Sequence, residues 1–204
     1  MTHRGTRRLE TRTRILNIAA AEMRSRGPNS VGVADVMNRA GLTHGGFYAH
    51  FRCKDALIAA ALSEMFTQKE AMFHRLTADK PPDVGLGDYI DSYLSEAHRD
   101  HPENGCPIAA LSPELARLDP EIRQVFDSGV TTLLDLIEPL LAPRHAHDRR
   151  ALVVSLVAEM AGALALSRAI LDQRTSAYVL SVARRTVRSR VGLPAPGQRG
   201  EKQA

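Results

Sequence analysis

Apolar residues recur at intervals of three and four positions through most of this 204-residue chain. Such spacing places them along one face of an α-helix, whereas a half-buried strand would alternate apolar and polar residues, and the sequence has no clear alternating run. Apolar residues make up 44% of the chain and charged residues 25%, a balance typical of a globular protein that buries a core. The sequence therefore predicts an all-α fold.

Glycine, proline and N-capping residues mark where the expected helices begin and end. Helices are predicted over residues 11–26, 33–40, 43–51, 54–76, 86–101, 107–118, 120–141, 148–171 and 175–191. Gly41 follows the second of these at the position that favours glycine after a helix, and Thr43 is a favourable N-cap for the third. The second and third helices are thus short and joined by a tight turn.

Positive charge is concentrated near the N-terminus. Residues 1–60 contain ten Lys or Arg and four Asp or Glu, whereas the rest of the chain contains 17 and 19, respectively. A basic segment on a nearly neutral body indicates a polyanion such as DNA as one partner, although a solvated charged face would have the same composition.

The two short helices follow a longer one and lie within the basic segment. This arrangement matches the helix-turn-helix motif, whose second short helix enters the major groove of DNA. Simple helical hairpins have the same spacing. The pattern alone therefore leaves both interpretations open.

Residues 41–57, with the sequence GLTHGGFYAHFRCKDAL, resemble the recognition helix and following turn of the TetR/AcrR family of transcriptional regulators almost position by position. Residues 33–40 and 15–27 resemble the two preceding helices of that family, and the strong resemblance covers about residues 10–65. Beyond it the chain resembles the family in layout, and residues 105–115 are similar to a segment found in a subgroup of these regulators.

The resemblance implies a division into three parts. Residues 1–53 would form an N-terminal three-helix helix-turn-helix DNA-binding domain with a basic arm, and residues 54–192 a larger helical effector-binding and dimerisation domain. Residues 193–204, which are rich in glycine, proline and charge, are expected to be a disordered tail. The implied function is that of a homodimeric repressor on a palindromic operator, released by a small-molecule effector or by modification of Cys106.

The family pattern implies DNA contacts at eight positions, which are Thr43, His44, Gly45, Gly46, Phe47, Tyr48, His50 and Lys54. At the helix start, the Thr43 hydroxyl can donate to a phosphate with the help of the helix dipole, or act only as an N-cap. His44, Tyr48 and His50 carry donors for phosphates or base edges, and the Lys54 ammonium suits a phosphate. Phe47 can contact a thymine methyl or pack in the core.

The glycine pair within the expected recognition helix is unusual. Gly45 and Gly46 are each less favourable in a helix than alanine by up to about 1 kcal/mol. They indicate either close approach of the backbone to DNA or a loosely formed helix. Many family members have a polar residue in place of Gly46 and serine in place of Cys53, so base readout here falls more on His44 and on DNA shape. The basic arm before Arg14 can add nonspecific backbone contacts, or be solvated and disordered.

The expected helix at 148–171 is apolar on most sides. Ser155, Glu159 and Arg168 lie within it, and buried charge is costly in lipid, so a core or interface helix is a better interpretation than a membrane span. Small residues form a stripe that lets a second helix approach closely. With the expected helix at 175–191, they would build a dimer interface that includes Leu156, Ala158, Met160, Gly162, Ala165, Ala169, Tyr178 and Val182. An internal helix pair is the alternative.

The chain contains two cysteines, Cys53 and Cys106, and no C-x-x-C motif, so a disulfide framework is excluded. The basic N-terminus lacks the apolar segment of a secretory signal, and a cytoplasmic protein is expected.

Pro107 suits the first position of a helix, which would make Cys106 an N-cap residue with a lowered thiol pKa. Cys106 is therefore either an effector-sensing residue for oxidants and electrophiles or a small buried apolar residue.

Enzymatic motifs are missing from the sequence. It contains no phosphate-binding glycine loop, no H-E-x-x-H and no G-x-S-x-G motif, so no enzyme activity, cofactor or resident metal is expected. His98, His101 and Cys106 include the ligand types of a transition-metal site at loose spacing. A helical enzyme or metal-binding protein that uses Cys106 and His98 remains the alternative function, although it leaves the N-terminal motif unexplained.

Overall fold

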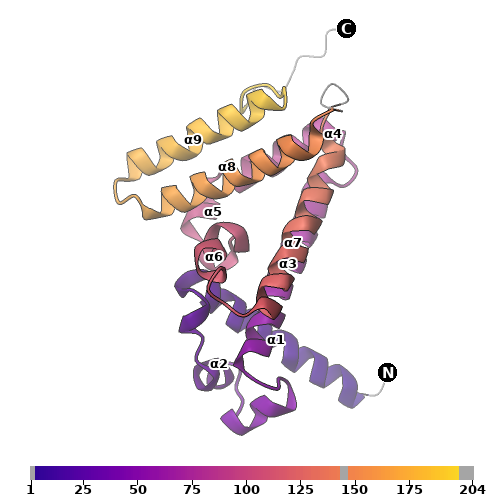
Figure 1. Cartoon of the computed structure of the whole chain (residues 1–204), viewed down its shortest axis with the longest axis vertical. Coiled ribbons are helices and arrows are strands. Elements are labelled where there is room, and N and C mark those ends of the chain that lie inside the picture. Colours follow the sequence, from indigo (N-terminus) through magenta and orange to yellow (C-terminus); the bar gives the residue numbers. More distant parts are fainter. Residues whose placement is uncertain (1–2, 143–146, 198–204) are drawn as a thin grey trace. The chain divides into compact units, whose positions relative to one another are not determined.

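The computed structural model describes residues 3–142 and 147–197. Over these residues the regular structure is entirely helical, which confirms the all-α prediction (Figure 1). The α-helices are α1 (His3–Arg26), α2 (Val33–Arg39), α3 (Lys54–Thr77), α4 (Pro82–Tyr93), α5 (Glu96–Asp100), α6 (Pro107–Leu115), α7 (Pro120–Ile137), α8 (Arg149–Ala169) and α9 (Gln173–Arg190). Short 3₁₀ helices are η1 (Pro28–Ser30), η2 (His44–Ala49), η3 (Pro102–Asn104) and η4 (Glu138–Leu140).

Helix α1 begins well before the predicted start at Thr11. The Thr11 hydroxyl donates to the Arg7 carbonyl oxygen at 2.8 Å within the helix instead of capping its beginning. The segment expected to be a loose arm is therefore helical from His3 onward.

Two predicted helices are each divided in the structure. The helix expected over 86–101 is interrupted at Leu94, and Ser95 caps the separate helix α5 by accepting a hydrogen bond from the His98 backbone N–H at 3.1 Å. The helix expected over 120–141 ends at Ile137 and continues as η4, which contains Pro139. Proline lacks the N–H that the α-helix would require at that position.

The chain divides into two compact units. Among the described residues, the first comprises residues 3–69 and 102–129, and the second comprises residues 70–101, 130–142 and 147–197. This grouping differs from the functional division expected at residue 53, because α6 and the first part of α7 share a core with α1 to α3. The division into DNA-binding and effector domains therefore stays a prediction, and most of the expected tail, residues 198–204, lies outside the described residues.

The core of the first unit contains large side chains from α1, α2, η2, α3, α6 and α7. They include Ile15, Met23, Val36, Met37, Phe47, Phe51, Leu57, Leu62, Met65, Leu111, Leu115 and Ile122. Full burial of one such side chain stabilises a fold by about 1.5–3 kcal/mol relative to exposure. This core holds the short helices α2 and η2 in place, although helices of their length have little stability in isolation.

In the second unit, α8 and α9 run side by side and α9 also packs on α4 (Figure 1). Arg188, a buried arginine near the C-terminal end of α9, links α9 to α4. Arg188 forms an ion pair with Asp91 of α4 at 2.9 Å and donates to the carbonyl oxygens of Gly87 at 3.2 Å and Pro194 at 2.7 Å. Breaking one partner of a buried pair is costly because an unpaired charge remains, so this contact fixes the register of α9 against α4.

Helix α8 is the one helix among the described residues with the length and apolar composition to cross a membrane. Core helices of soluble proteins meet the same criteria. Its polar residues are bound within the unit: Arg190 donates to Ser155 at 2.7 Å and pairs with Glu159, and Arg168 donates to the His98 carbonyl oxygen at 2.7 Å. These contacts support the interpretation of α8 as a core or interface helix.

Candidate nucleic-acid interface

The turn between α2 and η2 is closed by glycine. Gly41 has φ +69°, a left-handed conformation that strains other residues. Its N–H donates to the Asn38 carbonyl oxygen at 2.9 Å, and the Leu42 N–H donates to the Met37 carbonyl oxygen at 2.9 Å. These two bonds are the Schellman pattern of a helix C-terminus, and they confirm the predicted role of Gly41.

The expected recognition helix is the 3₁₀ helix η2, not an α-helix. Thr43 stands at its N-cap with extended backbone, and the Thr43 carbonyl oxygen accepts the Gly46 N–H at 3.0 Å. The Thr43 side chain makes no capping bond, so the expected hydroxyl cap is wrong. The exposed hydroxyl is instead available to a ligand.

Side chains of η2 separate into a buried and an exposed set. The Phe47 ring is 2% exposed and stacks on Phe51 with ring centroids 5.7 Å apart. Tyr48 is 69% exposed, and His44 is exposed as well. Burial of the Phe47 ring favours the core-packing alternative, in which the ring anchors the helix that presents Tyr48, and its contact with a thymine methyl stays a prediction.

Neither glycine of η2 is required by packing inside the protein. A Cβ atom at Gly45 would have nothing within 4 Å, and one at Gly46 would lie 3.7 Å from both Met37 Cε and Thr43 Oγ1, an ordinary contact distance. Gly45 is exposed and Gly46 is half-buried. The glycines thus leave the backbone of η2 open to close approach from outside.

His50 and Lys54 are both engaged with the protein. His50 is half-buried at the C-terminal end of η2, and burial, followed by the positive charges of Arg8 and Arg12, lowers the pKa of its imidazole. It is thus a neutral group at pH 7. Lys54 is the first residue of α3, and its ammonium group donates to the Asn29 carbonyl oxygen at 3.3 Å.

Two arginines of α1 contact the C-terminal end of η2. The sequence alone did not identify these two residues as part of the site. The Arg8 guanidinium donates to the Ala49 carbonyl oxygen at 2.8 Å, and the Arg12 guanidinium donates to that of His50 at 2.6 Å. Arg12 also lies over the Phe51 ring, 4.3 Å from its centroid. Their separation of four residues, which places two side chains on one helix face, was the only signal in the sequence.

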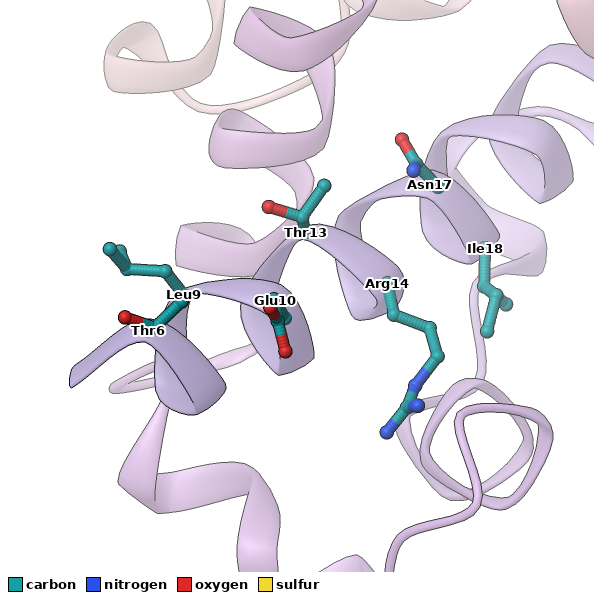
Figure 2. Close-up of a pocket in the computed structure, with 7 residues that line it drawn as sticks. All are labelled: Thr6, Leu9, Glu10, Thr13, Arg14, Asn17 and Ile18. Carbon is teal, nitrogen blue, oxygen red and sulfur yellow. The ribbon is translucent and has the colours of Figure 1, made fainter. Parts of the chain in front are cut away.

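The opposite side of the same helix forms an open surface groove (Figure 2). Its lining comes entirely from α1 and consists of Thr6, Leu9, Glu10, Thr13, Arg14, Asn17 and Ile18. Arg14 is exposed here and Leu9 is 57% exposed. Arg14 therefore differs from Arg8 and Arg12, which contact η2.

Cys106 is buried in the first unit with 2% exposure and stands at the N-cap of α6, as predicted. Neither it nor Cys53 forms a disulfide. Burial lowers the pKa of the Arg24 guanidinium to about 10, and the charges of Cys106 and Glu64 partly oppose that effect. Arg24 is 7% exposed and donates to the Glu103 carbonyl oxygen at 3.2 Å.

The described residues contain no group of three or more His, Cys, Asp or Glu side chains arranged to hold a metal ion. The possible site formed by His98, His101 and Cys106 is therefore not supported. The His98 ring instead lies within hydrogen-bonding distance of the Tyr93 carbonyl oxygen, with 2.7 Å to Nδ1, and packs edge-on against the Tyr93 ring.

The predicted dimer residues divide into two sets. Leu156 and Met160 are buried inside the second unit and support α8 from within, and their place in a dimer interface stays a prediction. Val182 is half-buried. The remaining members are exposed, and they are Ala158, Gly162, Ala165, Ala169 and Tyr178. A Cβ at Gly162 would meet nothing within 4 Å. Leu166 and Leu171, which are 54% and 96% exposed, extend this apolar surface.

Comparisons with known proteins agree with this arrangement. Residues 15–61 match the model of the family described as bacterial regulatory proteins, tetR family. The fold is similar to that of the reduced form of E. coli NemR, with a TM-score of 0.75 and 19% identity over 93% of this chain and 100% of that chain. It is also similar to a TetR transcriptional regulator from Chloroflexus aurantiacus, with a TM-score of 0.75 and 24% identity over 90% of this chain and 94% of that one.

A third similar structure is a TetR-family transcriptional regulator from Agrobacterium tumefaciens, with a TM-score of 0.75 and 22% identity over 89% of this chain and 97% of that chain. At these identities the solved structures establish a shared fold. No curated protein matches the chain.

Proposed function

We propose that the chain is a regulator of the TetR family and acts as a homodimeric repressor that releases a palindromic operator in response to an effector. The match of residues 15–61 to that family's model and the fold shared with its solved members support the proposal. Regulators of this family bind DNA and are not enzymes. The proposed site of action is the bacterial cytoplasm, where the operator lies.

One observation carries the DNA-binding proposal. Thr43, His44 and Tyr48 are exposed on a short helix whose buried side is fixed by Phe47 and Phe51. Rigid support beneath exposed donors is what base and phosphate contacts require, since each freely rotating group would lose entropy on binding. Gly45 and Gly46 would let the backbone approach the DNA, and Lys54 would add a phosphate contact once it leaves the Asn29 carbonyl.

The exposed apolar surface of α8 and α9 supports the dimer. Ala158, Gly162 and Ala165 lie along α8, and small side chains let the helix of a second copy approach closely. Tyr178 adds an exposed aromatic ring from α9, a residue type common in interfaces. A two-fold axis through this surface would pair two recognition helices and explain a palindromic operator.

Release requires an effector that prefers the form unable to bind DNA, because equal affinity for both forms would shift no equilibrium. A small molecule bound by the effector domain is one such signal. Modification of Cys106 by an oxidant or electrophile is the second. It is supported by the position of Cys106 at the N-cap of α6 and by the fold shared with NemR, whose crystal structure is of a reduced form.

The test is a fluorescence-anisotropy titration of the protein with DNA from its own upstream region, repeated at several salt concentrations with unrelated DNA as the control. Tight, sequence-selective binding with a steep salt dependence is expected. Equal and weak binding to all DNA, including a genome-derived library that contains every candidate operator, would contradict the proposal. The oligomeric state is measured in parallel by analytical ultracentrifugation.

A further inference from the structure

The C-terminal end of η2 depends on contacts from outside the helix. The last carbonyl groups of any helix lack partners within it, and a 3₁₀ helix has poorer hydrogen-bond geometry than an α-helix. Two glycines in six residues weaken η2 further. Contacts from outside the helix are therefore needed to hold its C-terminal end in place.

Helix α1 supplies such anchors at the C-terminal end. Arg8 and Arg12 are one helical turn apart, and they donate to the consecutive carbonyl oxygens of Ala49 and His50 at 2.8 and 2.6 Å. A positive charge at a helix C-terminus is also favourable for the helix dipole.

A third contact fixes the orientation of Arg12. Its guanidinium carbon lies 4.3 Å from the centroid of the Phe51 ring, which itself is 4% exposed and stacks on Phe47. A cation over an aromatic face is attracted to the negative face of the ring. The ring thus holds the guanidinium where it meets the His50 carbonyl.

We propose that Arg8 and Arg12 are positioning residues for DNA binding: they clamp the C-terminal end of η2 through main-chain carbonyls and hold Tyr48 and His44 in the geometry that reads the operator. This inference rests on the proposed function. It assigns the two arginines an intramolecular role, in contrast to phosphate contacts by a basic arm.

The two roles have different signatures. A residue that contacts a phosphate adds about 0.9 to the slope of log K against log salt concentration, and its removal lowers that slope. Loss of a clamp residue weakens binding through the geometry of η2 and leaves the slope unchanged. It also loosens η2 in the protein without DNA, where the hydrogen bonds from the N–H groups of His50 and Phe51 to the Phe47 carbonyl close the helix.

The experiment compares the full-length protein with Arg8→Gln, Arg12→Gln and the double variant. Hydrogen–deuterium exchange of peptides that cover residues 43–53 is measured without DNA, and operator affinity is measured at several salt concentrations. Arg14→Gln is the matched control, because it removes the same charge from an exposed position on the same helix. Thermal unfolding monitors the fold of every variant.

The expected result is faster exchange in the 43–53 peptides of the Arg8 and Arg12 variants and an operator affinity about tenfold lower with an unchanged salt slope. Arg14→Gln leaves the exchange as in the unmodified protein. A lower slope with unchanged exchange would overturn the clamp in favour of phosphate contacts, and faster exchange with normal affinity would overturn its role in binding. Since exchange is measured without DNA, it tests the clamp even if the operator proposal fails.

Discussion

The ring of Phe66 on α3 occupies the space beside Gly129 on α7. A Cβ atom at position 129 would overlap the Cγ and Cδ2 atoms of that ring. Phe66 also packs edge-on against Phe126, with ring centroids 5.8 Å apart. Glycine at 129 is thus what allows α3 and α7 to approach each other at this point.

Gly129→Val is expected to destabilise the protein by about 1–3 kcal/mol, because the added side chain must displace an aromatic ring from a packed position. Urea unfolding followed by circular dichroism measures the change. Ser128→Ala, at the exposed neighbouring position, should stay within about 0.5 kcal/mol of the unmodified protein. Equal stability of the two variants would show that Phe66 moves aside without cost.

His44→Ala and Tyr48→Phe are expected to lower operator affinity by about tenfold or more without a change in thermal stability, since both side chains are exposed. Anisotropy titrations and melting curves of the two variants provide the measurement. Phe47→Ala is the contrasting variant, because removal of this buried ring should lower the free energy of unfolding by about 3–5 kcal/mol. Normal affinity in both surface variants would overturn the assignment of the site.

Ala165→Arg is expected to prevent the proposed dimer and leave a monomer, because a charged side chain on the small-residue surface of α8 keeps a second helix away and would be buried unpaired. Sedimentation velocity detects the change. Val84→Arg places the same charge at another exposed apolar position of the second unit, on α4, and should stay dimeric. A dimer that persists in Ala165→Arg refutes the proposed interface.

Cys106→Ser should abolish release from the operator by oxidants and electrophiles while preserving affinity under reducing conditions. At 2% exposure, Cys106 is reached by small reagents or through brief opening of the fold, so the unmodified protein should respond more slowly than a free thiol does. Operator binding after graded peroxide treatment is the readout, with Cys53→Ser as the control for the exposed cysteine. An identical response in Cys106→Ser would exclude sensing by this residue.

Stability is expected to fall in acid partly through His50. The pKa of His50 in the folded protein lies below the value of 6.5 of an unperturbed imidazole, so the unfolded chain binds this proton more readily. The stabilising contribution is present above that value and is lost as the pH falls through the folded pKa. The drop in melting temperature between about pH 7.5 and about pH 5 should be smaller in His50→Gln than in the unmodified protein. An equal drop would mean that His50 titrates normally.

Local chemistry made part of this structure predictable. Gly41 was identified because only a left-handed residue suits the end of α2, and that requirement involves its immediate neighbours alone. The start of α1 was misplaced because the partners of Arg8 and Arg12 lie far along the chain, at Ala49 and His50. The sequence pattern places the two arginines on one helix face, but it does not identify the carbonyl groups that they contact until the fold is known.

The functional site was predictable in composition and less so in orientation. Tyr48 and Phe47 are adjacent and both aromatic, yet one is exposed and the other is core. In a helix as short as η2, the tight 3₁₀ geometry and the position of Phe51 decide which side faces inward. The contact between α1 and α6 was likewise hidden, because the two helices meet only in the folded core.

The hydrogen bonds from Arg8 and Arg12 end on main-chain oxygens, which every amino acid possesses. The identity of the side chains at 49 and 50 is therefore irrelevant to these bonds, and those at 44 and 48 do not take part in them. Residues that discriminate between DNA sequences can be exchanged on a backbone whose placement is maintained separately. Under the proposed function, a few surface substitutions would redirect this chain to a new operator, with its frame left intact.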